Sequence, residues 1–194
     1  MRLILGISGA TGPIYGIRLL EVLKKKRIET HLIITPTSQK IIPQETSYSV
    51  KDVTHLATSV HQIEDLGAPI SSGSFKTDGM VVIPCSIKSL SGIAHSHNEN
   101  LLIRAADVTL KERRRLLLVV RETPLHQGHL ELMLQACKTG AILLPPMPAF
   151  YFRPKTIDDL VNHTVGKVLD LFGIGHDLFK RWGSGATRKH TKRR

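Results

Sequence analysis

The sequence predicts an α/β protein in which helices cover both faces of a mostly parallel β-sheet, a three-layer α/β/α sandwich. Several short stretches are rich in leucine and β-branched residues and lack polar alternation, which is typical of strands buried on both faces. Amphipathic stretches separate them, and this alternation favours a doubly wound sheet. A length of 194 residues with 41% hydrophobic and 22% charged residues suits one globular domain.

The predicted elements follow one another in order. Each strand is a nearly continuous apolar run, and we expect strands at 3–5, 30–36, 79–86, 116–122 and 141–146. Apolar residues at helical spacing fill the gaps, and we expect helices at about 13–25, 37–47, 87–96, 100–112, 128–139 and 156–171. Residues 48–78 include the small polar stretch APISSGSFKTDG and are predicted to be loop.

Gly6, Gly9 and Gly12 separate the first strand from the first helix. Outward-pointing N–H groups and the dipole of the following helix favour an anion there. The spacing is neither the dinucleotide fingerprint nor the Walker loop, and the hydroxyls of Ser8 and Thr11 suit a mononucleotide held by one phosphate. An ordinary tight turn would need similar glycines, so this stretch alone leaves both interpretations open.

Candidate site residues follow the strands, because sheets of this kind bind ligands beyond the carboxyl ends of their strands. They are Ser8 to Gly12, Thr35 and Ser38, Pro84 to Ser86, Arg121 and Glu122, and Pro145 to Tyr151. Arg104 and Lys111 lie two turns apart on one helix, so they share a face. That face could direct two cations to one phosphate or could be a solvated basic surface.

The net charge of +11 is concentrated near the end of the sequence. Seven of the 27 basic residues lie from Lys180 onward without an acidic residue, which leaves 20 against 16 acidic residues elsewhere. We expect residues 183–194 to be a disordered basic tail. The rest shows no nucleic-acid-binding signature, so no nucleic-acid partner is predicted.

Other features exclude several kinds of protein. The sequence has neither a long apolar run nor a basic-then-apolar leader, so no membrane association is expected. Cys85 and Cys137 make no disulfide framework, which fits a cytoplasmic protein. A cysteine that ends a buried strand, such as Cys85, is more often packed than nucleophilic.

No metal site is predicted. The pairs His95-x-His97 and His126-x-x-His129 lack the further ligands of a zinc motif. Asp158 and Asp159 fit the first turn of a helix, where acidic side chains complement the dipole. Ser86 is a natural N-cap that could also donate to a ligand.

Five segments in order resemble the UbiX-like flavin prenyltransferases, formerly described as aromatic-acid decarboxylase subunits: GISGATGPIYGIRLL, PCS, NLLIRAADVTLKERR, LVVRETPL and MPAFYFRPKTIDDLV. The resemblance covers residues 1–182 and implies a single FMN-binding flavoprotein domain with a Rossmann/flavodoxin-like fold. It implies transfer of a dimethylallyl group from dimethylallyl monophosphate to N5 and C6 of reduced FMN. The product, prenylated FMN, would serve a UbiD-type aromatic-acid decarboxylase, and the protein would form a homo-oligomer, a dodecamer, with flavin sites at subunit junctions.

The resemblance also implies roles for individual residues. The FMN-binding positions would be Gly9, Ala10, Thr11, Thr35, Ser86, Arg104 and Arg121. The prenyl phosphate would be held by Lys111, Tyr151 and Lys167, with Lys111 also catalytic. Glu45 and Glu122 would be the catalytic carboxylates. Cations of this kind could replace a metal, because they stabilise the charge that develops on the departing phosphate.

Three positions depart from the pattern of many relatives. Thr11 replaces serine, Lys167 replaces an arginine and becomes a point charge, and Leu66 falls about where an aromatic residue lines the prenyl pocket. Two other functions stay open. One is an FMN-dependent decarboxylase of the cysteine type, although the histidine expected in its first helix is missing from GPIYGIRLL. The other is a non-catalytic FMN-binding subunit of a decarboxylase complex.

Overall fold

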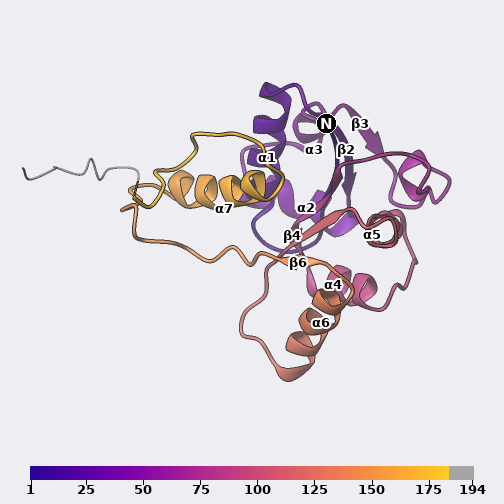
Figure 1. Cartoon of the computed structure of the whole chain (residues 1–194). Helices are drawn as coiled ribbons and strands as arrows, with labels where there is room; N and C mark the ends of the chain where they lie inside the picture. Colours follow the sequence, from indigo (N-terminus) through magenta and orange to yellow (C-terminus); the bar gives the residue numbers. More distant parts are fainter. Residues whose placement is uncertain (184–194) are drawn as a thin grey trace, which may run out of the picture. The chain divides into compact units, whose positions relative to one another are not determined.

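The computed structural model describes residues 1–183, which form parts of two compact units, Met1–Pro146 and a second that begins at Met147 (Figure 1). Each unit is described by itself. The single domain over residues 1–182 stays a prediction. Beyond Gly183, the predicted basic tail lies outside the described residues.

The first unit alternates strands and helices. Its strands are β1 (Arg2–Ile7), β2 (Glu29–Ile34), β3 (Ser59–His61), β4 (Gly79–Cys85), β5 (Arg115–Val120) and β6 (Ile142–Leu143). Its helices are α1 (Pro13–Lys25), α2 (Pro36–Glu45), α3 (Val50–Thr54), α4 (Ile87–Ala94), α5 (Leu101–Lys111) and α6 (Gln127–Lys138), with a 3-10 turn, η1 (Pro69–Ser71). Within the described residues these strands form one parallel sheet in the order β3-β2-β1-β4-β5-β6. The predicted α/β, flavodoxin-like class is confirmed.

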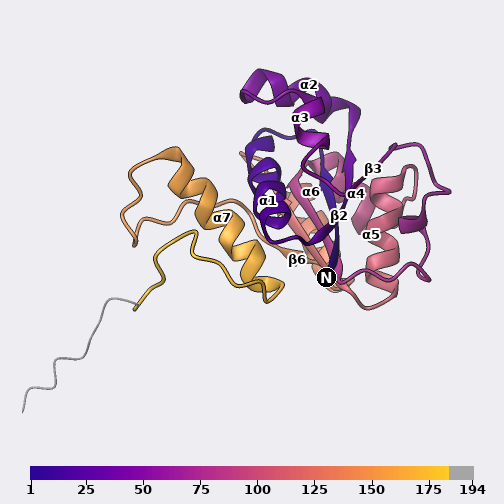
Figure 2. The ribbon, with the colours of Figure 1, turned by 90° about the horizontal axis from the view of Figure 1, so that it is seen from above.

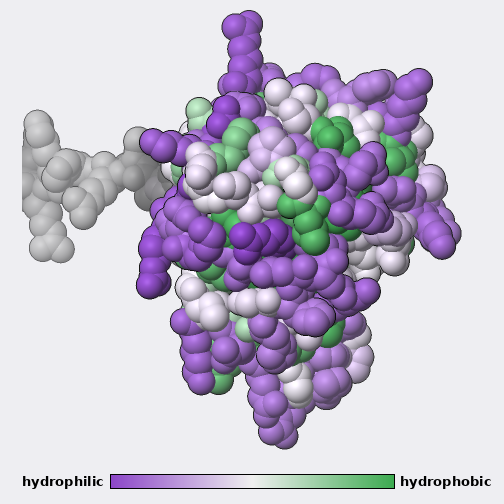
Figure 3. Space-filling model, turned by 90° about the vertical axis from the view of Figure 1, so that its right-hand side faces the viewer, coloured by the Kyte–Doolittle hydropathy of each residue, from purple (hydrophilic) through white to green (hydrophobic). Residues whose placement is uncertain are grey.

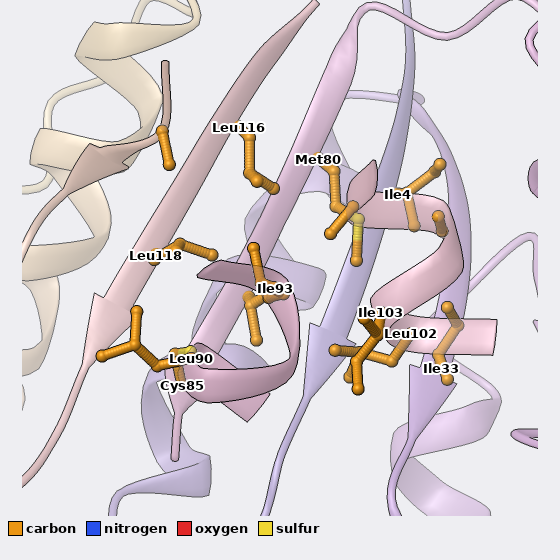
Figure 4. Close-up of a cluster of buried hydrophobic side chains, with 14 of the residues drawn as sticks. Ile4, Ile33, Met80, Cys85, Leu90, Ile93, Leu102, Ile103, Leu116 and Leu118 are labelled. Atoms are coloured by element: carbon orange, nitrogen blue, oxygen red, sulfur yellow. The ribbon is translucent and has the colours of Figure 1, made fainter. Parts of the chain in front are cut away.

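The helices of this unit cover the two faces of the sheet. On one face, side chains of α4, α5 and α6 pack on alternate strand residues such as Ile4, Met80 and Leu118 (Figure 4). Cys85 joins the same cluster because the register between β4 and β5 shifts after Val82. On the other face lies α1 (Figure 2).

Gly16 allows α1 to lie close to β4. A Cβ atom there would lie 2.5 Å from the carbonyl oxygen of Ile83, which is backbone that no side-chain rotation can move. Any larger residue would push α1 away from the sheet. This close approach fixes the position of α1 relative to β4, and with it the end of the loop that precedes α1.

The strand order reverses between β1 and β4. The chain goes from β1 to β2 on one side and later returns to β4 on the other. The chain therefore leaves β1 toward α1 on one face and leaves β4 toward α4 on the other face, and doubly wound sheets bind ligands at such a point. The loop residues predicted from the sequence begin at this point.

The structure differs from the sequence prediction chiefly in residues 48–78, which contain α3, β3 and η1 instead of loop alone. Helix α3 has only five residues and β3 only three, too short for a periodic pattern. Strand β2 ends at Ile34 because Thr35 caps α2 and Pro36 begins it. Strand β6 is limited to two residues before the prolines at 145 and 146.

The second unit contains α7 (Ile157–Leu171). Thr156 and Asp159 form a capping box at its start, and Asp158 and Asp159 lie in its first turn as predicted. Among residues 1–183, no helix is long and apolar enough to cross a membrane. The face in Figure 3 is mostly hydrophilic, with scattered hydrophobic residues.

Candidate active site

The loop after β1 is tied to the loop after β4 by Ser8. Its hydroxyl is fully buried, donates to the carbonyl of Pro84 at 3.0 Å and accepts the N–H of Ser86 at 2.8 Å. The sequence suggested that Ser8 could offer a hydroxyl to a ligand. The structure instead uses this hydroxyl to hold the two loops together.

The same loop also packs on α2. A Cβ atom on Gly9 would lie 2.6 Å from Cβ of Thr37, so only glycine allows this approach. Gly12 has φ of 93° and donates its N–H to Oε2 of Glu45 at 2.8 Å. The two ends of α2 thus fix the glycine loop between them. Ala10 and Thr11, which lie between these glycines, are half-buried.

Three helices of the first unit begin at this edge. Gly12 precedes α1, Thr35 caps α2 by accepting the N–H of Ser38 at 3.4 Å, and Ser86 caps α4 by accepting the N–H of Ser89 at 3.3 Å. The hydroxyl of Ser38 is buried and has no hydrogen-bond partner among the described residues. Partial positive charge from several helix N-termini fits a phosphate monoester.

Arg121 and Glu122 follow β5 at the same edge. The N–H of Arg121 donates to the carbonyl of Cys85 at 3.0 Å, which places it beside the β4 loop. Burial raises the pKa of Tyr15 on α1, and the positive charge of Arg121 opposes this shift. The guanidinium is therefore close to α1. Glu122 is exposed, and its carboxylate accepts the N–H of Thr123 at 3.0 Å.

Cys85 is fully buried, and burial raises the pKa of its thiol to about 12. A thiol in this state supplies almost no thiolate at neutral pH. The packing interpretation of Cys85 is confirmed.

Lys111 lies away from these loops within one chain. It is the last residue of α5, shortly before Arg115 begins β5. Arg115 is in register with Gly79, the first residue of β4, so Lys111 lies at the amino-terminal edge of a sheet whose strands span roughly 20 Å. Its ammonium group pairs with Glu112.

Arg104 lies two turns earlier on α5 and has partners of its own. Its Nε donates to the carbonyl of Ser71 at 3.1 Å, and Nη1 pairs with Asp107 at 3.2 Å. The first unit therefore brings the loop residues, Thr35, Glu45, Ser86, Arg121 and Glu122 together at one edge. Lys111 lies at the opposite edge, and the side chain of Arg104 is bonded to Ser71 and Asp107.

Tyr151 and Lys167 lie in the second unit. The hydroxyl of Tyr151 is 3.2 Å from Nε2 of His163 on α7. Lys167 follows His163 by one turn, and its positive charge contributes to lowering the pKa of that histidine. Sequence reasoning missed His163, although its spacing of four from Lys167 puts both on one helix face.

A cavity of about 1020 Å³ lies elsewhere in the first unit, between α4 and α6. His95, His97, His126 and His129 lie around it, and none of the predicted site residues does. In the part of the chain that the structure describes, no group of three or more histidine, cysteine or acidic side chains is placed to hold a metal ion.

Leu66, the position where some relatives are expected to have an aromatic residue, is 48% exposed in the turn after β3.

Comparison with known proteins gives concordant matches. Residues 1–168 match the family model described as Flavoprotein. The flavin prenyltransferase UbiX of Thauera aromatica is 57% identical over the full length of both chains. A crystal structure of AnUbiX in complex with FMN and dimethylallyl pyrophosphate superimposes with a TM-score of 0.93 at 45% identity, covering 95% of this chain and 98% of that one.

A second solved structure is the dodecameric FMN-dependent UbiX-like decarboxylase from Escherichia coli O157:H7. It gives a TM-score of 0.92 at 50% identity and covers 94% of this chain and 99% of its own. These matches include both compact units.

Proposed function

Since the chain belongs to the flavin prenyltransferase UbiX family, we propose that it transfers a dimethylallyl group from dimethylallyl monophosphate to N5 and C6 of reduced FMN. Reduced FMN is a substrate in this reaction, and prenylated FMN is its product. The product then serves a UbiD-type decarboxylase that acts on aromatic acids. The protein itself decarboxylates nothing.

The observation that carries this proposal is the set of loops at the carboxyl edge of the sheet. Gly9 lies against Thr37 at the start of α2, next to the cap residue Thr35, and Ala10 and Thr11 follow Gly9 in the same loop. The helix N-termini at this edge suit the single phosphate of FMN, and the buried Ser38 hydroxyl is a further donor. Ser86 and Arg121 complete the FMN site from the β4 and β5 loops. The similarity to AnUbiX, whose crystal structure holds FMN, supports FMN binding by this chain.

The catalytic groups have two tasks, which are to stabilise the departing phosphate and to transfer protons. Breaking an allylic C–O bond leaves growing negative charge on the phosphate, and fixed cations stabilise that charge more in the transition state than before it. Lys111 and Lys167 supply such cations, and Tyr151 supplies a hydroxyl donor. Glu122 and Glu45 take up or return a proton at the flavin during bond formation.

A second copy of the chain supplies Lys111 and Arg104. Lys111 lies at the amino-terminal edge of the sheet in its own chain, and Arg104 is bonded there to Ser71 and Asp107, so we place the grip on the prenyl phosphate where subunits meet. The dodecameric relative from Escherichia coli O157:H7 supports an assembly of this kind, and we propose a dodecamer here. The reaction takes place in the cytoplasm, where the free thiols of Cys85 and Cys137 stay reduced.

The proposal is tested by asking whether the product of this protein can serve as the cofactor of a UbiD-type decarboxylase. The purified protein is incubated anaerobically with reduced FMN and dimethylallyl monophosphate, and the protein-free filtrate is added to a UbiD-type decarboxylase that lacks its cofactor. We expect the filtrate to activate this decarboxylase, and we expect this protein alone to release no CO2 from an aromatic acid. An inert filtrate together with CO2 release by this protein would favour the decarboxylase alternative.

A further inference from the structure

The side chain of His163 is held in a fixed position within the second unit. Its ring is parallel to that of Phe152, with centroids 5.2 Å apart and planes at 11°. Phe179 contacts it from another direction at 4.8 Å between centroids. In this position Nε2 is 3.2 Å from the hydroxyl of Tyr151. The aromatic neighbours thus aim one ring nitrogen at one phenol oxygen.

The surroundings of His163 favour the neutral form of its imidazole. Burial lowers the pKa of His163 below its ordinary value of 6.5, and the nearby Lys167 lowers it further. A neutral imidazole carries one N–H, so either Nε2 donates to the phenol or the phenol donates to Nε2. Only the first arrangement leaves the O–H of Tyr151 available to another acceptor.

We propose that His163 is a positioning residue that donates Nε2–H to Oη of Tyr151 and thereby directs the Tyr151 O–H to the phosphate of the prenyl substrate. The inference rests on the proposed function, in which Tyr151 and Lys167 hold that phosphate. Lys167 lies on the same face of α7 as His163, so one helix face orients the phenol and carries the cation. The proposed FMN site, by contrast, is built from loops of the first unit.

The test compares two substitutions of His163. His163→Phe keeps a planar ring between Phe152 and Phe179 but removes the donor, while His163→Gln restores an N–H near the position of Nε2. We expect His163→Phe to lower kcat/KM for dimethylallyl monophosphate by about tenfold, because the Tyr151 O–H is no longer directed to the charged phosphate and one hydrogen bond to it is lost. The KM for reduced FMN should stay unchanged, and His163→Gln should recover most of the loss. If His163→Phe does not fold, judged by its Tm, His163→Met takes its place.

A double-mutant comparison separates positioning from general destabilisation. In a Tyr151→Phe background the phenol O–H is gone, so His163→Phe should cause no further loss of kcat/KM. Equal and additive losses in both backgrounds would overturn the inference, as would wild-type kinetics of His163→Phe or failure of His163→Gln to recover activity. If the wild-type protein leaves reduced FMN unmodified, the proposed function falls and this inference falls with it.

Discussion

The hydroxyl of Ser8 and the carboxylate of Glu45 show how neighbours decide the use of a polar side chain. Ser8 follows a strand just as the FMN-binding candidates do, yet its hydroxyl bonds to Pro84 and Ser86 and is fully buried. Glu45 accepts the N–H of Gly12 from the far end of α2. This hydrogen bond places the carboxylate of Glu45 on the glycine loop, where its proposed proton-transfer role requires it. Sequence patterns identify the candidates, and hydrogen bonds decide which remain available.

Glu122→Gln tests the catalytic carboxylate. Gln keeps the size and the acceptor for the Thr123 N–H, but it cannot take up a proton at neutral pH. We expect FMN binding to be unchanged and single-turnover formation of prenylated FMN to fall about 10²–10³-fold. Glu64→Gln, at an exposed position in the turn after β3, is the matched control. A Glu122→Gln enzyme that turns over at the wild-type rate would remove the catalytic role of this residue.

At the scale of elements, α1 depends on its close approach to β4 at Gly16. A methyl group at this position would collide with the carbonyl of Ile83, so the helix must shift. We expect Gly16→Ala to lower the free energy of unfolding by about 1–3 kcal/mol, measured by urea denaturation. Gly175→Ala is the control because a Cβ there meets nothing within 4 Å. Equal stability of the two variants would show that α1 tolerates displacement.

Strand β3 carries a histidine that resists protonation. Nε2 of His61 lies 2.9 Å from Nδ1 of His31, and burial, followed by the charge of His31, lowers the pKa of His61, while Asp65 opposes this shift. Glu29 and Arg2 adjoin the pair from β2 and β1. The unfolded chain therefore binds a proton near pH 6.5 that the folded chain takes up only at lower pH, so stability falls as the pH drops below that value.

The measurement is the free energy of unfolding at pH 7.5 and pH 5.5. We expect the wild type to lose more stability between these values than His61→Asn, which cannot titrate. Because His163 also has a lowered pKa, His61→Asn should reduce the pH dependence without abolishing it. An identical pH dependence in wild type and variant would contradict the role of His61.

Long apolar runs made most of the first unit predictable from the sequence. Strands β1, β4 and β5 are buried on both faces and leave a continuous signal, and α1 and α5 have clear amphipathic faces. Strand β3 was missed because three edge residues, Ser59 to His61, have no recognisable period. His163 was missed because its partner, Tyr151, is separated from it by the loop before α7. The site assignments made by resemblance stay predictions.

At the scale of the whole molecule, the proposed role of Lys111 requires a second copy of the chain to complete the site, because Lys111 lies at the amino-terminal edge of its own sheet. We expect Lys111→Met and Glu122→Gln proteins to be nearly inactive alone. Random mixing of such subunits during refolding should create intact junctions and restore about a quarter of wild-type activity, if each site takes one residue from each of two copies. No recovery in assemblies shown by mass spectrometry to be mixed would mean that both residues act within one chain.

The most direct test of prenyl transfer is the mass of the flavin itself. The protein is incubated anaerobically with reduced FMN and dimethylallyl monophosphate, and the released flavin is analysed by mass spectrometry. The proposed function predicts a flavin that has gained one C5 prenyl unit. Bound FMN that returns unmodified, with other prenyl phosphates equally inert, would contradict prenyl transfer and favour a non-catalytic or decarboxylating flavoprotein.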